Sequence, residues 1–122
     1  MTWNLFIDDE RMPVDVTWAP WDIREMYRDE KWVVVRNVAF ALSIIINRGS
    51  MPKYISFDHD LGENELTGYD LAKILVDDAL DFPDEPHMQF PADFAFYVHS
   101  KNPIGKANIE GLLNNYLEFK AK

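Results

Sequence analysis

The sequence predicts an α/β fold, a doubly wound parallel sheet of about four strands with helices on both faces. Four short apolar runs, at residues 2–7, 32–35, 54–57 and 94–98, are each followed by polar residues. Continuous apolar runs of this length are typical of strands that are buried on both faces. Segments with helical signals separate the runs, and strands that alternate with helices indicate βαβ units and a parallel sheet.

The four predicted strands are apolar and end sharply. They read TWNLFI, WVVV, YISF and FAFYV, and the first residues after them are Asp8, Arg36, Asp58 and His99. Right-handed crossovers between such strands place the intervening helices on the two faces of the sheet.

Three helices are predicted between and after these strands. Asn37 is a suitable N-cap for a helix over residues 38–47, which Gly49 would end. A second helix is expected from about Thr67 to Leu80, and a third over about residues 104–119, where the apolar residues keep a helical spacing.

Two stretches are less regular. Residues 11–31 contain two prolines and two tryptophans, and we expect only a short helix near Asp22 to Arg28. Residues 81–93 are rich in proline and predict a loop. We interpret Trp18, Trp21 and Trp32 as packing residues rather than as a platform for stacking bases.

The composition limits the class of protein. A chain of 122 residues is the size of one domain, so we expect residues 1–122 to form a single domain. The absence of cysteine excludes disulfides, thiolate metal sites and a cysteine nucleophile. The formal net charge of −9 argues against broad nucleic-acid binding, although it does not exclude one small phosphate pocket.

The N-terminal residues do not resemble a signal peptide. Acids follow the first apolar run where a signal peptide has basic residues, and no apolar run approaches the ~20 residues of a membrane span. We therefore expect a cytoplasmic protein without a membrane partner.

Acidic side chains follow two of the predicted strands. Asp8 and Asp9 follow the first strand, and Asp58, His59 and Asp60 follow the third. Parallel strands bring their carboxyl ends to one edge of the sheet, where carboxylates would repel each other unless a proton or a divalent cation joins them. Oxygen ligands favour Mg²⁺, and the nearby histidines leave Mn²⁺ possible. The alternative is that these acids are only turn formers and helix caps.

The segment HSKNPIGKAN, residues 99–108, follows the fourth strand. Ser100, Asn102 and a helix that begins near Pro103 could bind an anion, because the N–H groups of a helix start are free for phosphate. Lys106 adds a positive charge one turn later. In the plainer interpretation this is a strand-to-helix turn with Asn102 as N-cap, and the two interpretations are compatible.

Four motifs occur together and in order: LFIDDER followed shortly by Pro13, SFDHDLG (residues 56–62), TGYDLA (residues 67–72) and HSKNPIGKANIE (residues 99–110). Together they cover most of the chain and resemble the cyclic-phosphate-processing receiver-like family, a divergent branch of the response-regulator receiver fold. The resemblance implies a receiver-like, flavodoxin-like sheet. It also implies processing of cyclic phosphates at RNA ends or on nucleotide derivatives.

The resemblance also implies site residues. By similarity to ordinary receivers, Asp8, Asp9 and Asp58 would bind Mg²⁺, together with the backbone carbonyl of Asp60. Ser100 stands where ordinary receivers keep a hydroxyl that contacts the phosphoryl group. Ordinary receivers have a fifth strand with a Lys-Pro pair, which we do not find in these residues; Lys101 or Lys106 could take the place of that lysine. Two histidines, His59 and His99, stand where ordinary receivers rarely have them.

The leading hypothesis is a metal-dependent phosphoesterase that acts on a cyclic phosphate of a nucleotide derivative or RNA end. Its cofactor would be Mg²⁺ or Mn²⁺. The assigned residues form three groups: metal ligands Asp8, Asp9, Asp58 and Asp60; catalytic residues Asp58, His59 and His99, the histidines as general acid and base; and phosphate-binding residues Ser100, Asn102, Lys106 and Arg36.

Two other hypotheses remain open. A non-catalytic receiver-like module would bind a protein partner or a phosphate ligand, and the acidic composition and the Trp-bearing segment fit such a surface. It would, however, have no need of His59 and His99 beside the acids. A phosphorylatable receiver would instead be labelled at Asp58 by acetyl phosphate.

Overall fold

The structure is a computed structural model that describes residues 2–122. Its centre is one sheet of four parallel strands in the order β2-β1-β3-β4. The strands are β1 (Asn4–Ile7), β2 (Val33–Val35), β3 (Tyr54–Phe57) and β4 (Ala95–Val98). This order is that of flavodoxin-like sheets, in which the chain reverses direction between β1 and β3. The predicted fold class is confirmed.

The register of the strands aligns their carboxyl ends. Ile7 lies beside both Val35 and Phe57, and Phe57 lies beside Val98. The residues that follow these strand ends therefore meet at one edge of the sheet.

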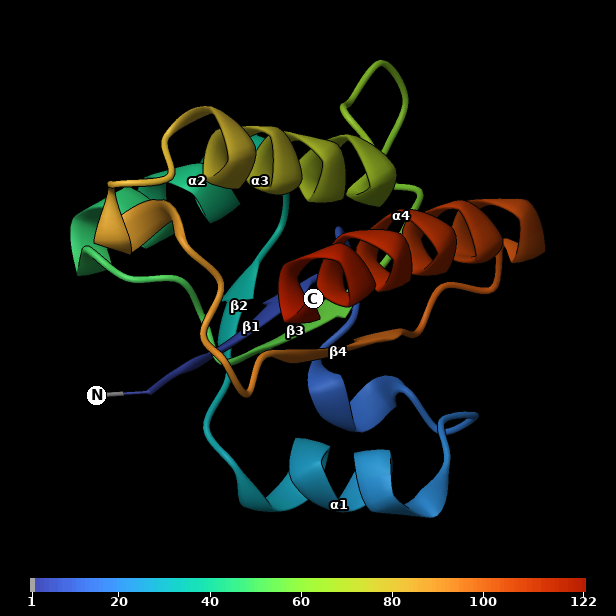
Figure 1. Ribbon diagram of the computed structural model, residues 1–122. Helices are drawn as coiled ribbons and strands as arrows, with labels where there is room; N and C mark the ends of the chain where they lie inside the picture. The colour runs from blue at the N-terminus through green and yellow to red at the C-terminus, as the bar shows by residue number, and fades with distance from the viewer. Residues whose placement is uncertain (1) are drawn as a thin grey trace.

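Helices cover both faces of the sheet, but unequally. The helices α2 (Val38–Arg48), α3 (Gly68–Asp81) and α4 (Pro103–Ala121) lie on one face, whereas α1 (Trp21–Asp29) and the short 3-10 helix η1 (Pro13–Asp15) lie on the other (Figure 1). None of the helices within residues 2–122 is long and apolar enough to cross a membrane.

The core has two parts because side chains alternate between the faces of a strand. In β1, Leu5 and Ile7 join the large cluster under α2, α3 and α4, while Phe6 joins the smaller cluster under α1 with Val16 and Tyr27. Burial on both faces explains why β1 is apolar at successive positions.

The helix starts follow the predicted capping residues. The Asn37 side chain accepts a hydrogen bond from the N–H of Phe40 at 2.8 Å. Thr67 and Asp70 form a reciprocal capping box at the start of α3. Asn102 is the N-cap of α4, as the plainer interpretation of residues 99–108 requires.

Some boundaries differ from the prediction. Helix α1 begins one residue earlier than expected and ends one residue later, and a second 3-10 helix, η2 (Pro86–Met88), lies within the proline-rich loop. Trp32 packs edge-on to Phe6 with ring centroids 6.3 Å apart, as predicted for a packing residue. The prediction was wrong for Trp21, which is 67% exposed because it stands at the solvent side of the first helical turn.

Candidate functional site

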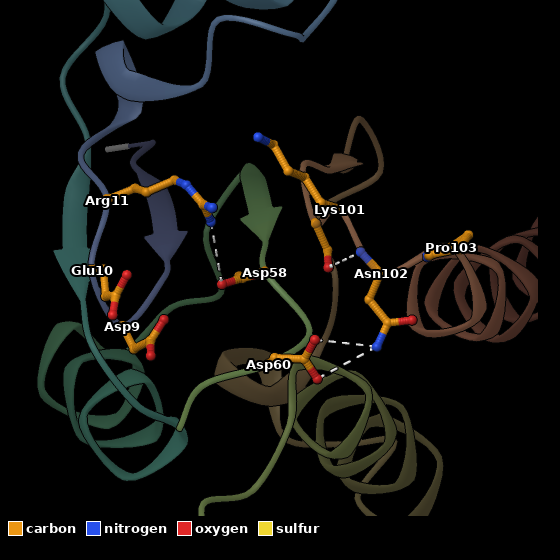
Figure 2. Close-up of a pocket in the computed structure, with 9 residues that line it drawn as sticks. Asp9, Glu10, Arg11, Asp58, Asp60, Lys101, Asn102 and Pro103 are labelled. Carbon is orange, nitrogen blue, oxygen red and sulfur yellow. Dashed lines mark hydrogen bonds and ion pairs between the residues drawn. The ribbon is translucent and has the colours of Figure 1, made fainter. Parts of the chain in front are cut away.

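An open cavity of about 510 Å³ lies at the carboxyl edge of the sheet, beside the ends of β1, β3 and β4 (Figure 2). This is the reversal point between β1 and β3, where open α/β sheets bind ligands. The lining residues come from three loops and the first residue of α4: Asp9, Glu10, Arg11, Asp58, Asp60, Ser100, Lys101, Asn102 and Pro103.

Asp8 lies fully buried behind this cavity. Its Oδ1 accepts hydrogen bonds from the N–H groups of Glu10 and Arg11, both at 2.8 Å. Its Oδ2 lies 3.0 Å from Nε2 of His99 and 3.4 Å from Nη1 of Arg11. Burial by itself would raise the pKa of Asp8, but the hydrogen bonds from His99 and the two backbone N–H groups outweigh it and hold that pKa well below its ordinary value.

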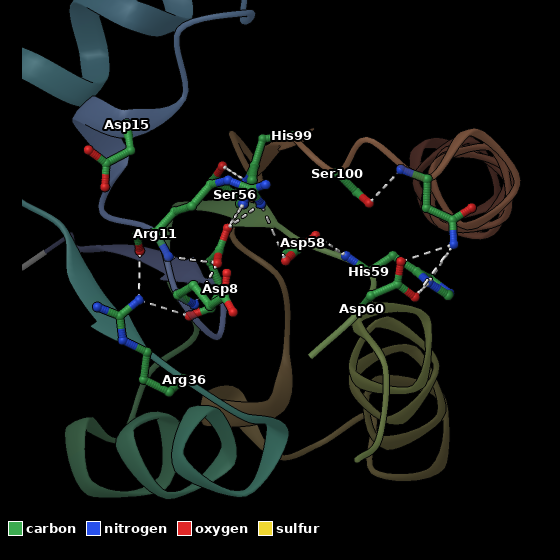
Figure 3. Close-up of polar contacts among 12 residues, drawn as sticks. Asp8, Arg11, Asp15, Arg36, Ser56, Asp58, His59, Asp60, His99 and Ser100 are labelled. Carbon is green, nitrogen blue, oxygen red and sulfur yellow. Dashed lines mark hydrogen bonds and ion pairs between the residues drawn. The ribbon is translucent and has the colours of Figure 1, made fainter. Parts of the chain in front are cut away.

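His99 is also fully buried and belongs to a chain of hydrogen bonds (Figure 3). Its ring stacks on Phe6 with centroids 4.6 Å apart. Its Nδ1 lies 2.7 Å from Oγ of Ser56, which in turn lies 2.6 Å from the hydroxyl of Tyr27. A neutral imidazole satisfies every group: Tyr27 donates to Ser56, Ser56 donates to Nδ1, and Nε2–H donates to the Asp8 carboxylate.

This chain defines what His99 does. Because its ring is sealed from solvent and both nitrogens are engaged within the protein, His99 holds the carboxylate of Asp8 in a fixed orientation. It does not line the cavity.

Asp58 lies beside Asp8 at the end of β3. Its Oδ1 accepts a hydrogen bond from the N–H of His59 at 2.8 Å, and only 5% of the residue is exposed. Burial, and then the negative charge of Asp8, raise the pKa of Asp58.

The donor atoms at this edge fit a hard divalent cation. One ligand atom each from Asp8, Asp58 and His99 lie within 4.8 Å of one another. Within residues 2–122, the carboxylate of Asp9 makes no hydrogen bond or ion pair, so its oxygens are open. Because both ring nitrogens of His99 are engaged with Ser56 and Asp8, the available donors are carboxylate oxygens, which suit Mg²⁺ or Mn²⁺.

The absence of a side chain at Gly68 allows the start of α3 to pack closely against the loop after β3. A Cβ at this position would collide with the backbone carbonyl oxygen of Asp58. The N–H of Gly68 donates to the carbonyl of His59 at 2.9 Å. The glycine of the TGYDLA motif therefore lets the start of α3 support the loop that carries Asp58.

Asp60 and Asn102 line the cavity, and His59, which does not line it, contacts Asp60 from behind that wall. Nδ1 of His59 lies 3.0 Å from Oδ1 of Asp60, and Nδ2 of Asn102 donates to Oδ2 of Asp60 at 3.2 Å. These two contacts lower the pKa of Asp60. The imidazole of His59 lies against Gly105, where a Cβ would collide with the ring.

The segment after β4 supplies hydrogen-bond donors. The Oδ1 of Asn102 accepts from the N–H of Gly105 at 3.0 Å, so the amide caps α4 and contacts Asp60 at the same time. The hydroxyl oxygen of Ser100 accepts from the N–H of Asn102 at 3.1 Å, which leaves the hydroxyl hydrogen for another partner.

Two predicted phosphate-binding residues do not line the cavity. The Nζ of Lys106 lies over the ring of Tyr97, 5.2 Å from its centroid. The Nη1 of Arg36 donates to the carbonyl oxygens of Asp8 at 3.1 Å and Arg11 at 2.7 Å, which holds the loop after β1. Binding of phosphate by Lys106 and Arg36 stays a prediction.

Arg11, Trp18 and Ser56 were not assigned a role at the site from the sequence, and Lys101 was named only as a possible replacement for the receiver lysine. Arg11 and Lys101 line the cavity, and both cations contact the ring of Trp18, at 5.0 Å and 4.2 Å from its centroid. The indole N–H of Trp18 donates to the carbonyl of His99 at 2.8 Å. Arg11 could have been found from its place in the LFIDDER motif, and Ser56 from being the one polar residue in an apolar strand.

Comparison with known proteins agrees with this geometry. Neither the curated proteins nor the solved structures contain a significant match to the chain. A family model described as the cyclic-phosphate processing receiver domain matches residues 3–115, which include every strand and the first two thirds of α4. The chain therefore belongs to the family of cyclic-phosphate processing receiver domains.

Proposed function

We propose that the protein is a phosphoesterase that depends on Mg²⁺ or Mn²⁺ and hydrolyses a cyclic phosphate on a nucleotide derivative or an RNA end. The observation that carries the proposal is the composition of the cavity. Carboxylates that follow β1 and β3, those of Asp9 and Asp58, form one wall, and the segment after β4 supplies hydrogen-bond donors and a lysine to another wall, where Asn102 is bonded to Asp60 (Figure 2). A phosphate between these walls would meet a cation on one side and donors on the other.

The acids would hold the metal. Asp9 offers open carboxylate oxygens, and Asp58 lines the same cavity. Oδ2 of Asp8 would join them once Arg11 no longer donates to it. When bound, the cation polarises the phosphoryl oxygens and neutralises the charge that develops on them. The backbone carbonyl of Asp60 remains a proposed further ligand.

The segment after β4 would bind the phosphate. Ser100 has a hydroxyl hydrogen to donate, and Lys101 places a positive charge at the cavity wall. Asn102 contributes indirectly, because its amide is divided between the α4 cap and Asp60. Holding the phosphate in one orientation favours attack by water in line with one ester oxygen.

In the reaction, a water oxygen forms a bond to phosphorus while one of the two ring P–O bonds breaks. The water loses a proton and the leaving oxygen gains one. His59 is the proposed proton carrier: a carboxylate can only accept, so Asp60 fixes the proton on Nδ1 of His59 and leaves Nε2 as the basic nitrogen. His99 acts by holding Asp8.

The experiment is a panel of 2′,3′-cyclic nucleotides and RNA oligonucleotides with cyclic-phosphate ends, followed by ³¹P NMR. We expect conversion of a cyclic phosphate to a monoester with Mg²⁺ or Mn²⁺, and none with a chelator. Asp58→Asn should reduce the rate by about 10²-fold or more, and His59→Ala by roughly 10²- to 10⁴-fold. Asp84→Asn, in the exposed loop after α3, is the matched control and should leave the rate unchanged.

The alternative is a receiver-like module that binds a phosphate ligand or a protein partner without chemistry. The cavity itself is compatible with it, because the donors and carboxylates that line the cavity can bind a phosphate ligand whether or not a reaction follows. Saturable binding of a cyclic nucleotide with no turnover across the whole panel and both metals would support the module and contradict the phosphoesterase.

A further inference from the structure

The guanidinium of Arg11 lies where a metal ligand must become free. A single nitrogen, Nη1, is 3.4 Å from Oδ2 of Asp8 and 4.0 Å from Oδ2 of Asp58 (Figure 3). One internal cation thus contacts the carboxylates of two strands. It neutralises part of the charge that brings a divalent cation to this edge of the sheet.

The acceptor capacity of Asp8 is full in this arrangement. A carboxylate offers about four lone-pair sites. Two backbone N–H groups occupy Oδ1, and His99 and Arg11 occupy Oδ2. Three of these donors are built into the backbone or the buried core. The side chain of Arg11 is 33% exposed, so it is the donor that can leave.

Trp18 provides a place for the guanidinium beside the acids. The carbon Cζ of Arg11 lies 5.0 Å from the centroid of the indole ring, and the ring is tied to the end of β4 by its hydrogen bond to the carbonyl of His99. Cation–π contact keeps Arg11 at the cavity wall when its bond to Asp8 breaks. Lys101 and Ser100 line the same cavity.

We propose that Arg11 is an intramolecular competitor of the divalent cation. Metal binding removes its side chain from Asp8, and the released guanidinium, held near Trp18, then binds the oxygens of the substrate phosphate. Arg11 thereby couples the two ligands: the metal makes the arginine available, and a bound phosphate keeps the arginine away from the acids. This inference rests on the proposed metal-dependent function.

The test compares Mn²⁺ affinity, measured by electron paramagnetic resonance of the free ion, in the wild-type protein, Arg11→Gln and Lys101→Gln. Both variants remove one positive charge from the same cavity, but only Arg11→Gln vacates Oδ2 of Asp8. We expect Arg11→Gln to bind Mn²⁺ about 5- to 30-fold more tightly than wild type, and Lys101→Gln to change the affinity less than about 3-fold. In Mn²⁺-saturated protein, Arg11→Gln should bind inorganic phosphate about 10-fold more weakly.

Each outcome decides one statement. Equal Mn²⁺ affinity in Arg11→Gln and Lys101→Gln would overturn the competition, while metal binding itself would still support the proposed function. Absence of Mn²⁺ binding in all three proteins would overturn the proposed function and the competition together. Arg11→Met serves if the glutamine variant does not fold, because it keeps the aliphatic part of the side chain and removes the charge beside Asp8 and Asp58; an unchanged Mn²⁺ affinity in that variant would equally contradict the inference.

Discussion

At the scale of single residues, Asp8 and Asp58 show how environment separates two carboxylates of the same kind. Asp8 is more deeply buried, yet its pKa is lowered because four donors surround it. Asp58 has one backbone donor and a negative neighbour, and its pKa is raised. The ionised form of Asp58 is therefore the costly one in the metal-free protein.

Replacement of Asp58 by asparagine should stabilise the metal-free protein at pH 7. An acid whose pKa is raised on folding binds its proton more tightly in the folded state, so its ionisation lowers stability as the pH rises past the unfolded value near 3.8. We expect Asp58→Asn to raise the melting temperature by about 3–6 °C, which corresponds to about 1 kcal/mol in a domain of this size.

The difference between Asp58→Asn and wild type should also depend on pH. It should shrink as the pH falls through the raised pKa of Asp58, because the wild-type side chain then becomes neutral as well. Thermal unfolding in chelator from pH 7 to pH 4, with Asp84→Asn as the exposed control, measures this. A difference that stays constant over that range would show that charge on Asp58 is not its cause.

At the scale of the elements, two glycines in α4 distinguish support of the site from ordinary helix propensity. Gly105 lies against the imidazole of His59, whereas a Cβ at Gly111 would meet nothing within 4 Å. Both residues lie inside the same helix, so alanine gains similar helix propensity at each position.

We predict opposite effects of alanine at these glycines. Gly111→Ala should stabilise the protein by about 0.5–1 kcal/mol. Gly105→Ala should destabilise it, because the new methyl group must displace His59 and with it the contact to Asp60. Urea denaturation measures both changes, and the imidazole NMR signals of His59 should move only in Gly105→Ala. A stabilised Gly105→Ala protein with unmoved His59 signals would contradict the proposed packing.

The elements were the part of the structure that the sequence predicted best, because their signals are local. Asn37 and Thr67 are capping residues that act within one turn, and the apolar runs reflect burial on both faces of a strand. The meeting of Asp8 and Asp58 followed from parallel pairing alone. Burial of His99 and the reach of Arg11 across two strands could not be predicted, because they depend on how side chains from distant segments pack.

Lys106 is a second case in which the sequence could not predict where a side chain lies. Its position one turn into α4 suggested phosphate binding, but the rotation of the helix brings its ammonium group over Tyr97. Sequence spacing gives the distance of a residue along a helix, whereas the direction of its side chain depends on how that helix packs against the sheet.

At the scale of the whole molecule, the formal net charge of −9 makes any salt stabilising to some degree, because added ions screen the repulsion between acids. The stabilisation that a specific cation site provides must therefore be distinguished from the stabilisation that comes from screening. The acids of the loop after α3 and of the helices are spread over the surface, while Asp8, Asp9 and Asp58 meet at one edge of the sheet.

Mg²⁺ or Mn²⁺ at millimolar concentration should raise the melting temperature beyond the effect of NaCl at matched ionic strength. Binding at 100 times the dissociation constant adds about 2.7 kcal/mol to the free energy of unfolding. Asp58→Asn should lose most of this increment, and Asp84→Asn should retain it. Differential scanning calorimetry in each salt provides the measurement. Equal responses to NaCl and to the divalent salts would exclude a specific site.

The position of Trp18 has a consequence for spectroscopy. Its indole lies beside two cations at the cavity wall and is tied to the strand end behind Asp8. Indole emission shifts with the electric field of nearby charges, so a change in the position of either cation alters the fluorescence of this one tryptophan. The site thus carries an intrinsic optical probe, and occupancy can be followed without labelling, because Trp18 is the tryptophan whose ring contacts Arg11 and Lys101, two cations of the cavity wall.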